Sequence, residues 1–339
     1  MTPAAPHPVG AAALERAVAA VDAPDVVFAV SEDGHRTIRT GGTHPAPPTA
    51  RELLRYETGS ASKTLTALLL ARLEDQGRVD RRDTAAALLG TRPPAHRAPV
   101  TLAHLMTHTS GLPPLPADFY PGALPRWSSD PYAHYGPERV VRAFLRSRPH
   151  HRPGSRWRYS NFAVATLGQA LATAAGTGWS PLLTREVLAP LGLRDTALHP
   201  GPPGTDAVGH RADGSTTTPP LRAAGFDPAG AVRAAPHDLL TLLEAHLRPG
   251  TRQLAAALTT VQQPLLRRGP GRRETHTLGW FRHDTEHGPV CFHAGATCGQ
   301  QAFLGFRPDT GRALVALTTR RHRLRDPFVA TAYQLLTFD

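Results

Sequence analysis

Strand-like segments lie at both ends of this 339-residue chain, with helical patterns between them, and this distribution restricts the fold more than any other feature. Val26 to Val30 and Arg36 to Thr40 predict two strands joined by a turn at 32–34. Further strands, spaced like an antiparallel meander, are predicted at 277–283, 289–293, 301–306 and 313–319. The economical arrangement is one antiparallel sheet built from both chain ends, with the helical middle inserted into it.

Helical patterns fill most of the remaining chain. They are predicted at 10–22, 60–76, 102–108, 137–147, 161–175, 180–189, 237–247, 252–262 and 326–337. Two long segments, 112–136 and 196–235, are irregular, and the first is rich enough in Pro and aromatic residues to predict a lid or binding loop. We therefore predict an α+β fold in which residues 1–80 and 222–339 form a sheet domain flanked by helices, and residues 81–221 form an inserted all-helical domain.

Basic residues outnumber acidic ones by 38 to 27, which gives a net charge of +11, yet Lys63 is the only Lys. Asn161 is likewise the only Asn, and Ile38 the only Ile. These three residue types have AT-rich codons, so the abundance of Arg indicates a GC-rich coding bias. The densest basic segment, 320–325, lacks interleaved aromatic residues. We therefore expect no nucleic-acid partner, and attraction to an anionic substrate or an acidic protein is favoured instead.

The chain lacks the signals of secretion or membrane insertion. Its first apolar stretch, near 11–21, is broken by Glu15 and Arg16 and does not follow a basic segment. The best apolar run, Leu65 to Leu73, is too short to cross a bilayer. The two Cys residues do not require an oxidising compartment. We expect a cytoplasmic protein with no membrane association.

The first chemical motif is Gly59-Ser60-Ala61-Ser62-Lys63, at the start of the helical pattern over 60–76. Residues three apart share a helix face, so Ser60 and Lys63 can meet. A Ser hydroxyl needs a base to become a nucleophile, and burial at a helix start can leave a Lys amine neutral enough to act as one. Arg cannot do this. The alternative is that the Ser-x-x-Lys spacing occurs by chance and that Lys63 lies on the surface. Because Lys63 is the only Lys of the chain, this alternative is less favoured.

The second motif, Tyr159-Ser160-Asn161, precedes the helical pattern over 161–175. Its Tyr and Asn can point into one cleft, where Asn161 would bind a substrate carbonyl or amide. Adjacent cations are expected to lower the pKa of Tyr159 and let it relay a proton. The alternative is an Asn that caps the helix beside a packed Tyr.

The third motif, His293-Ala294-Gly295-Ala296, ends a predicted strand. Gly295 would let a substrate backbone approach the strand, and the N–H of Ala296 would form an oxyanion hole with that of Ser60. A strand-to-turn Gly beside an ordinary His is the alternative.

Two other groups could carry a site. His104 and His108 have the i, i+4 spacing of a metal pair, but no Glu follows His104 as in HExxH, so no metal is expected. Cys291 and Cys298 flank His293, but neither lies at a predicted helix N-terminus, so ordinary thiols are favoured over a Cys nucleophile.

Together and in this order, the three motifs resemble the Ser-x-x-Lys, Tyr-x-Asn and Lys/His-x-Gly pattern of the serine β-lactamase-like superfamily, which includes DD-peptidases, class C β-lactamases and esterases. The similarity covers about residues 25–335, and further matching segments are Tyr56-Glu57-Thr58-Gly59-Ser60, the run from His104 to Leu112, Pro228-Ala229-Gly230 with Asp238-Leu239-Leu240, and Leu278-Gly279-Trp280.

This resemblance implies that Ser60 is the acylated nucleophile, that Lys63 and Tyr159 share the roles of base and proton relay, and that no cofactor is needed. It implies substrate binding by Asn161, His293, Gly295 and Ala296. His293 stands where class C β-lactamases have Lys, which favours the DD-peptidase and esterase branches.

The function that we expect is therefore a serine acyl-transfer enzyme acting on a small ester or amide, either a cytoplasmic esterase or a transacylase of natural-product biosynthesis with an amine or alcohol acceptor. A β-lactamase or DD-peptidase and a non-catalytic binding relative are the alternatives. The oligomeric state stays open.

Overall fold

A computed structural model of the chain describes residues 9–90, 98–250, 253–269, 274–286 and 288–337. Eight strands form the main sheet in the order β2-β1-β11-β10-β9-β8-β7-β6, and every neighbouring pair is antiparallel. Their bounds are β1 (Val26–Glu32), β2 (His35–Gly41), β6 (Leu266–Arg268), β7 (Glu274–His276), β8 (Phe281–Thr285), β9 (Gly288–Ala296), β10 (Gln301–Arg307) and β11 (Arg312–Thr318).

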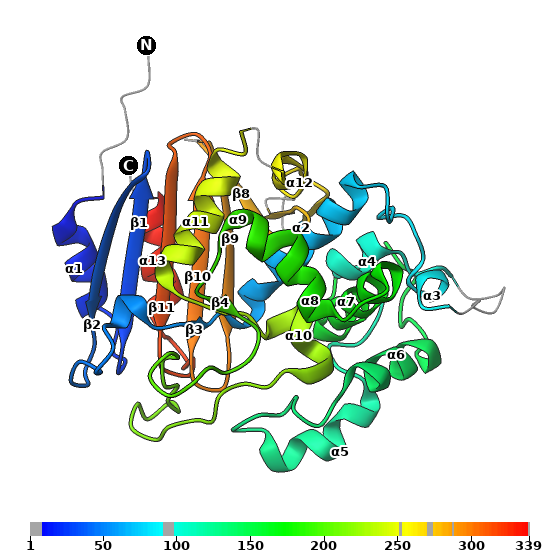
Figure 1. Cartoon of the computed structure of the whole chain (residues 1–339), viewed down its shortest axis with the longest axis horizontal. Coiled ribbons are helices and arrows are strands. Elements are labelled where there is room, and N and C mark those ends of the chain that lie inside the picture. The colour runs from blue at the N-terminus through cyan, green and yellow to red at the C-terminus, as the bar shows by residue number, and fades with distance from the viewer. Residues whose placement is uncertain (1–8, 91–97, 251–252, 270–273, 287, 338–339) are drawn as a thin grey trace.

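The two chain ends meet within this sheet, where β1 pairs with β11 and Val26 lies opposite Thr318. The predicted α+β fold, with one antiparallel sheet from both ends and helices inserted between them, is confirmed; Figure 1 shows the sheet on one side and most of the helices on the other. The exact domain boundaries at 80/81 and 221/222 stay a prediction.

The helices of the described ranges vary from single turns to four turns. They are α1 (Ala11–Ala19), α2 (Ser62–Asp75), α3 (Ala85–Leu88), α4 (Leu102–Met106), α5 (Tyr120–Ala123), α6 (Pro137–Arg146), α7 (Asn161–Ala175), α8 (Trp179–Leu183), α9 (Ala189–Leu191), α10 (Asp227–Gly230), α11 (Pro236–Leu247), α12 (Ala255–Thr260) and α13 (Phe328–Thr337). None of those in the described part of the chain combines the length and hydropathy that a bilayer-spanning helix needs.

Strand β1 is buried on both faces, which explains its unbroken apolar run. Val27 and Ala29 belong to the core shared with α11, whereas Val26 and Phe28 belong to the core under α1 and α13. Successive side chains of a strand point to opposite faces, so one apolar run serves both layers. The β1–β2 hairpin turns at Asp33 and Gly34, whose φ values are both positive at 50° and 88°, as a two-residue type I′ turn requires.

Several predicted elements differ in their bounds. The strand predicted at 277–283 begins only at Phe281, because Gly279 (φ +91°) completes a tight turn in which Thr277 N donates to Trp280 O at 3.0 Å. The short strands β6 and β7 were not predicted, since three residues carry too little alternation to detect. The helix predicted at 180–189 is divided among α8, a π turn over Thr184–Leu188 and α9.

The two irregular segments also contain short elements. A second sheet, in the order β3-β5-β4, joins Tyr56–Glu57, Arg233–Ala234 and Thr196–Ala197. The two-residue strands β4 and β5 bring the ends of the 196–235 segment to β3, which leads directly into Ser60. The predicted helix at 252–262 is observed as the shorter α12, and residue 252 lies outside the described ranges.

Candidate active site

Ser60 lies in a 3₁₀ turn (Gly59–Ala61) that opens α2, and the end of β9 packs directly against this turn. A Cβ on Gly59 would lie 2.6 Å from Ala296 O, and a Cβ on Gly295 would lie 2.0 Å from Thr58 O. Both positions therefore require glycine. The turn that carries Ser60 fills the space on the Cβ side of Gly295, and the predicted approach of a substrate backbone to this residue stays a prediction.

This close approach brings Ser60 and Ala296 to the same cavity, which both residues line. Their backbone N–H groups are the two that we predicted for an oxyanion hole, and that role stays a prediction.

Two polar side chains meet at the hydroxyl of Ser60. Lys63 Nζ lies 3.1 Å from Ser60 Oγ, and Tyr159 OH lies 2.8 Å from it. Lys63 Nζ also donates to the carbonyl of Ala229 at 2.7 Å. The structure thus brings together the residues of the first two motifs, although 99 positions separate Ser60 from Tyr159.

Burial favours the uncharged form of both neighbours of Ser60. Lys63 is completely buried, and this lowers the pKa of its amine to about 7. Among the described residues its polar partners are the Ser60 hydroxyl and the Ala229 carbonyl, which offer no negative charge to hold the proton. Burial also raises the pKa of Tyr159 to about 12, with the hydrogen bond to Ser60 opposing it. The predicted lowering of the Tyr159 pKa by adjacent cations was wrong, because burial outweighs the one contribution that lowers it.

Asn161 lies on the same cavity at the first position of α7. Its Nδ2 donates to Tyr132 OH at 3.1 Å, while its Oδ1 is buried and has no hydrogen-bond partner among the described residues. The helix cap is Ser160, whose Oγ accepts from Ala163 N at 2.9 Å. The alternative reading of Asn161 as the cap is therefore wrong, and its free carbonyl oxygen is available to a ligand.

The cavity at Ser60 has a volume of about 210 Å³ and a mainly apolar wall. Trp127, Pro131 and Tyr132 belong to the Pro-rich segment 112–136, which therefore contributes to the wall of this cavity, and its role as a lid or binding loop stays a prediction. None of the described residues that line the cavity is acidic. The full lining comprises Gly59, Ser60, Trp127, Pro131, Tyr132, Asn161, Leu221, Ala223, Phe226, Ala229, Gly230, Ala296, Thr297, Cys298 and Arg321.

His293 does not line this cavity. Its ring is buried, Nδ1 lies 2.7 Å from Ala294 O, and it lines a separate space of about 10 Å³ together with His108 and His276. Burial, followed by the charge of Lys63, lowers the pKa of His293 to about 3. The predicted substrate contact of His293 is therefore not seen. Its ring is instead buried and neutral, and lies near enough to Lys63 for the charge of that amine to affect its pKa.

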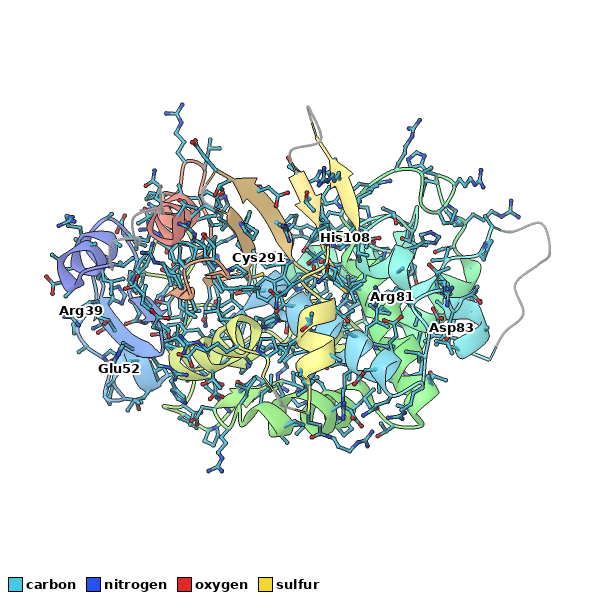
Figure 2. All side chains as sticks on the ribbon, turned by 90° about the horizontal axis from the view of Figure 1, so that it is seen from above. Arg39, Glu52, Arg81, Asp83, His108 and Cys291 are labelled. Atoms are coloured by element: carbon cyan, nitrogen blue, oxygen red, sulfur yellow. The ribbon has the colours of Figure 1, made fainter. Side chains whose placement is uncertain are left out.

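His108 is the residue that the sequence reading undervalued. Its backbone O accepts from Arg158 N at 2.8 Å and its Nδ1 accepts from Ser160 N at 3.2 Å, so it holds the chain on both sides of Tyr159. Its ring centre lies 4.4 Å from that of Tyr159. Figure 2 places it in the middle of the molecule, where strands and helices meet. The available signal was the His-Thr-Ser-Gly run at 108–111, which belongs to the segment from His104 to Leu112 that resembles the family.

The same geometry bears on the metal alternative. Helix α4 ends at Met106 and His108 has a left-handed φ of 58°, so the i, i+4 rule does not place its ring beside that of His104. Another group, Asp195, His237 and Asp238, has ligand atoms within 4.8 Å of one another. Its Asp238 carboxylate already accepts from Asp195 N at 2.7 Å, and we assign no metal there.

The two thiols differ in position. Cys291 is buried on β9, where burial raises its pKa to about 12, and Cys298 lies at the edge of the Ser60 cavity with a raised pKa. Neither has the lowered pKa that marks a Cys nucleophile.

A second buried polar group, centred on Arg233, lies beside β3, the strand that leads into Ser60. The Arg233 guanidinium is 3.6 Å from Glu57 Oε1 and 3.3 Å from Asp206 Oδ2. Glu57 Oε1 accepts from Leu221 N at 2.7 Å, and Glu57 N donates to Gln300 Oε1 at 2.9 Å. These contacts fix Leu221, which lines the cavity, to the strand that leads into Ser60.

Comparisons with known proteins identify the family and the fold of this chain. A family model described as beta-lactamase matches residues 11–338. The curated D-alanyl-D-alanine-carboxypeptidase/endopeptidase AmpH of Escherichia coli (strain K12) is 28% identical over 243 residues, which cover 65% of this chain and 59% of AmpH. Protein flp of Staphylococcus aureus (strain MRSA252) is 22% identical over 272 residues, covering 78% of this chain and 52% of flp.

The chain thus spans only about half to three fifths of these curated relatives. Among solved structures, a class C beta lactamase from Rhodobacter sphaeroides superposes with a TM-score of 0.78 and 23% identity over 96% of this chain and 98% of that one. At this identity the match concerns the fold.

Proposed function

Because the chain belongs to the beta-lactamase family of serine hydrolase-type enzymes, we propose that it acts on a small ester or amide through an acyl-Ser60 intermediate. One observation carries this proposal. The Ser60 hydroxyl lies 3.1 Å from a buried amine whose pKa is about 7, and 2.8 Å from a Tyr hydroxyl that keeps its proton. A nucleophile with a neutral base in hydrogen-bond reach is the arrangement that acyl transfer requires.

In the proposed first step, Ser60 Oγ attacks the substrate carbonyl carbon and its proton passes to the neutral Lys63 amine. The carbonyl oxygen becomes an oxyanion, which the N–H groups of Ser60 and Ala296 stabilise. The free Oδ1 of Asn161 accepts a hydrogen bond from an N–H of the substrate.

Collapse of the tetrahedral intermediate then breaks the bond to the leaving group. Tyr159 donates its proton to the leaving nitrogen or oxygen, and the Lys63 ammonium returns a proton to Tyr159. The acyl group is now bound to Ser60, and Lys63 is neutral again. A water, amine or alcohol attacks next, with Lys63 as the base. We therefore assign the base to Lys63 and the relay to Tyr159.

The apolar walls of the cavity favour an apolar acyl group. They also limit water, which supports transfer to an amine or alcohol beside hydrolysis. An esterase or a transacylase of natural-product biosynthesis in the cytoplasm is our proposal. A DD-peptidase is the second candidate, because AmpH carries that name. Cell fractionation with an antibody would test the compartment.

Intact-mass spectrometry tests the central step. The protein is exposed separately to a fluorophosphonate, a p-nitrophenyl ester and a penicillin. We expect one adduct with at least one of these probes, and no adduct with Ser60→Ala. Ser62→Ala is the matched control, because Ser62 lies two positions away and should leave labelling at Ser60 intact. Absence of any adduct would favour a non-catalytic binding relative.

A donor panel distinguishes the finer alternatives. Esters, amides, β-lactams and D-Ala-D-Ala peptides are compared with and without added amines or alcohols, and hydrolysed and transferred products are both quantified. Trp127→Ala opens the wall formed by segment 112–136. A transacylase should then lose transfer relative to hydrolysis. An unchanged ratio would show that this wall does not exclude water.

A further inference from the structure

The segment from Ala224 to Gly230 separates two cavities. Phe226, Ala229 and Gly230 line the cavity at Ser60, whereas Ala224 and Asp227 line a larger open groove of about 1090 Å³ on the other side. The groove runs between α6, α7 and the start of α8, which Figure 1 shows beside α10. The reaction proposed above does not use it.

Opposite charges occupy the two ends of this groove. Asp227 lies at one end, and its carboxylate has no hydrogen-bond or ion-pair partner among the described residues. Gly225 N donates to Tyr135 O at 2.9 Å, so this end adjoins the N-terminus of α6, where Glu138 also lines the groove. The negative end is therefore formed by two carboxylates.

Arg142 and Arg146 form the positive end. Both are exposed on α6, and neither has an ion-pair partner in the described part of the chain. At 1.5 Å per residue, they lie about 6 Å and 12 Å along the helix from Glu138. Between the two ends the wall is apolar, with Val141, Leu145 and Trp179.

The charge pattern favours a zwitterion over a simple ion. A free amine would meet two guanidinium groups, and a free carboxylate would meet Asp227. A ligand with one charge at each end satisfies both ends at once. An extended chain spans about 3.3 to 3.6 Å per residue, so the separation of about 6 to 12 Å between Glu138 and the two Arg residues corresponds to roughly two to four residues.

We propose that this groove binds a short zwitterionic peptide, with its ammonium group on Asp227, its carboxylate on Arg142 and Arg146, and an apolar side chain on Trp179. The site is distinct from the cavity at Ser60 and shares a wall with it. Burial raises the pKa of Asp227 to about 7, with Arg233 opposing it, so peptide binding should strengthen as pH rises through this value. The other titratable or charged groups that line the groove are Glu138, Arg142, Arg146 and His199.

Through the shared wall, a ligand bound in the groove would affect the position of Lys63, the proposed catalytic base. Asp227 begins α10, Pro228 O accepts from Thr66 Oγ1 at 2.7 Å, and Ala229 O accepts from Lys63 Nζ at 2.7 Å. Gly168 of α7 packs tightly against Pro228, since a Cβ there would lie 2.0 Å from its ring. A ligand on Asp227 thus presses on a turn that also holds Lys63.

Isothermal titration with the tripeptide Ala-Leu-Ala tests the site. We expect one saturable site per chain, at least tenfold weaker binding with Asp227→Asn or an N-acetylated peptide, and two- to fivefold weaker binding with Arg142→Gln. Arg16→Gln, an exposed change of equal charge on α1, should have no effect. Asn161→Ala alters only the Ser60 cavity and should also have no effect.

Three results would overturn the proposal: no saturable binding, binding insensitive to Asp227→Asn and to N-acetylation, or binding lost with Asn161→Ala. The last would place the peptide in the Ser60 cavity. These readouts need no turnover, so they remain informative if Ser60 is never acylated. Where an acylating probe is found, saturating peptide should change the acylation rate in the unaltered protein and not in Asp227→Asn. Equal rates with and without peptide would reject the coupling through α10.

Discussion

Lys63 and Arg233 are both buried cationic side chains, but their surroundings differ in charge. Around Lys63 the contacts are a hydroxyl, a carbonyl and an aromatic ring, none of which offsets a positive charge, and the pKa of the amine falls to about 7. Around Arg233, equally buried, two carboxylates lie within 3.6 Å. A buried cation without a counter-charge becomes a base, whereas one with counter-charges becomes a fixed structural link.

Of the changes that test this contrast, the exchange of Lys63 for Arg should have the largest effect on the acylation rate. Arg stays protonated, so Lys63→Arg would place a permanent charge where a neutral amine is required. We expect the acylation rate to fall roughly 10³-fold or more, since a general base contributes about 10²- to 10⁴-fold. Stopped-flow acylation with a reactive ester measures it. A variant that retained a tenth of the rate would exclude Lys63 as the base.

The matching change in the other group is Arg233→Met. It leaves the Glu57 carboxylate buried without its counter-charge, whereas Asp206 keeps its ion pair with Arg55. We expect the free energy of unfolding to fall by about 3–5 kcal/mol. Urea denaturation measures this change. Acylation per folded molecule should stay within about threefold. Arg82→Met, which removes an exposed ion pair, is the control and should cost less than about 1 kcal/mol. Equal losses in the two variants would contradict the structural role of Arg233.

His108 tests whether neutral polar groups beyond Ser60, Lys63 and Tyr159 also serve the reaction. His108→Leu removes the acceptor for Ser160 N and should lower kcat by roughly 10- to 100-fold through misplacement of Tyr159. His108→Asn should restore most of the rate, because Asn tolerates the left-handed backbone and offers an acceptor oxygen. Thermal melting separates this effect from unfolding. Failure of Asn to restore activity would argue against the positioning role.

The pH profile gives the smallest and most direct test. Only neutral Lys63 can accept the Ser60 proton, so the acylation rate should rise about tenfold per pH unit below pH 7 and level off above it. Because the pKa of Tyr159 is about 12, no fall is expected through pH 10. A profile that was flat from pH 5 to 8 would show that Lys63 is neutral throughout or uninvolved.

Much of the fold followed from local patterns. The alternating and continuous apolar runs near Val26 and Ala313 predicted the paired strands, and the Asp33-Gly34 turn predicted their hairpin. The short strands β6 and β7 escaped prediction because three residues do not define a period. The turn at Gly279 shortened a strand that its apolar sequence had suggested was longer.

The candidate site was only partly predictable. The spacing of Ser60 and Lys63 within one helical turn is local, so their contact could be expected. The direction of the His293 ring, the role of Gly295 and the pKa of Tyr159 depend on residues distant in sequence. The two-sided support of Tyr159 by His108 depends on chain segments 50 positions apart, and no local pattern reports it.

The order of the residues fixes which side chains are present and how far apart they lie along the chain. It places the lone Lys63 one helical turn after Ser60, where the two side chains can meet. Tertiary structure alone decided what state that lysine adopts. Its pKa depends on the environment that Ala229 and Tyr159 complete from far along the chain, and on the exclusion of water and of carboxylates around it. The same reason applies to Asp227, whose chemistry is set by the groove that three distant helices enclose.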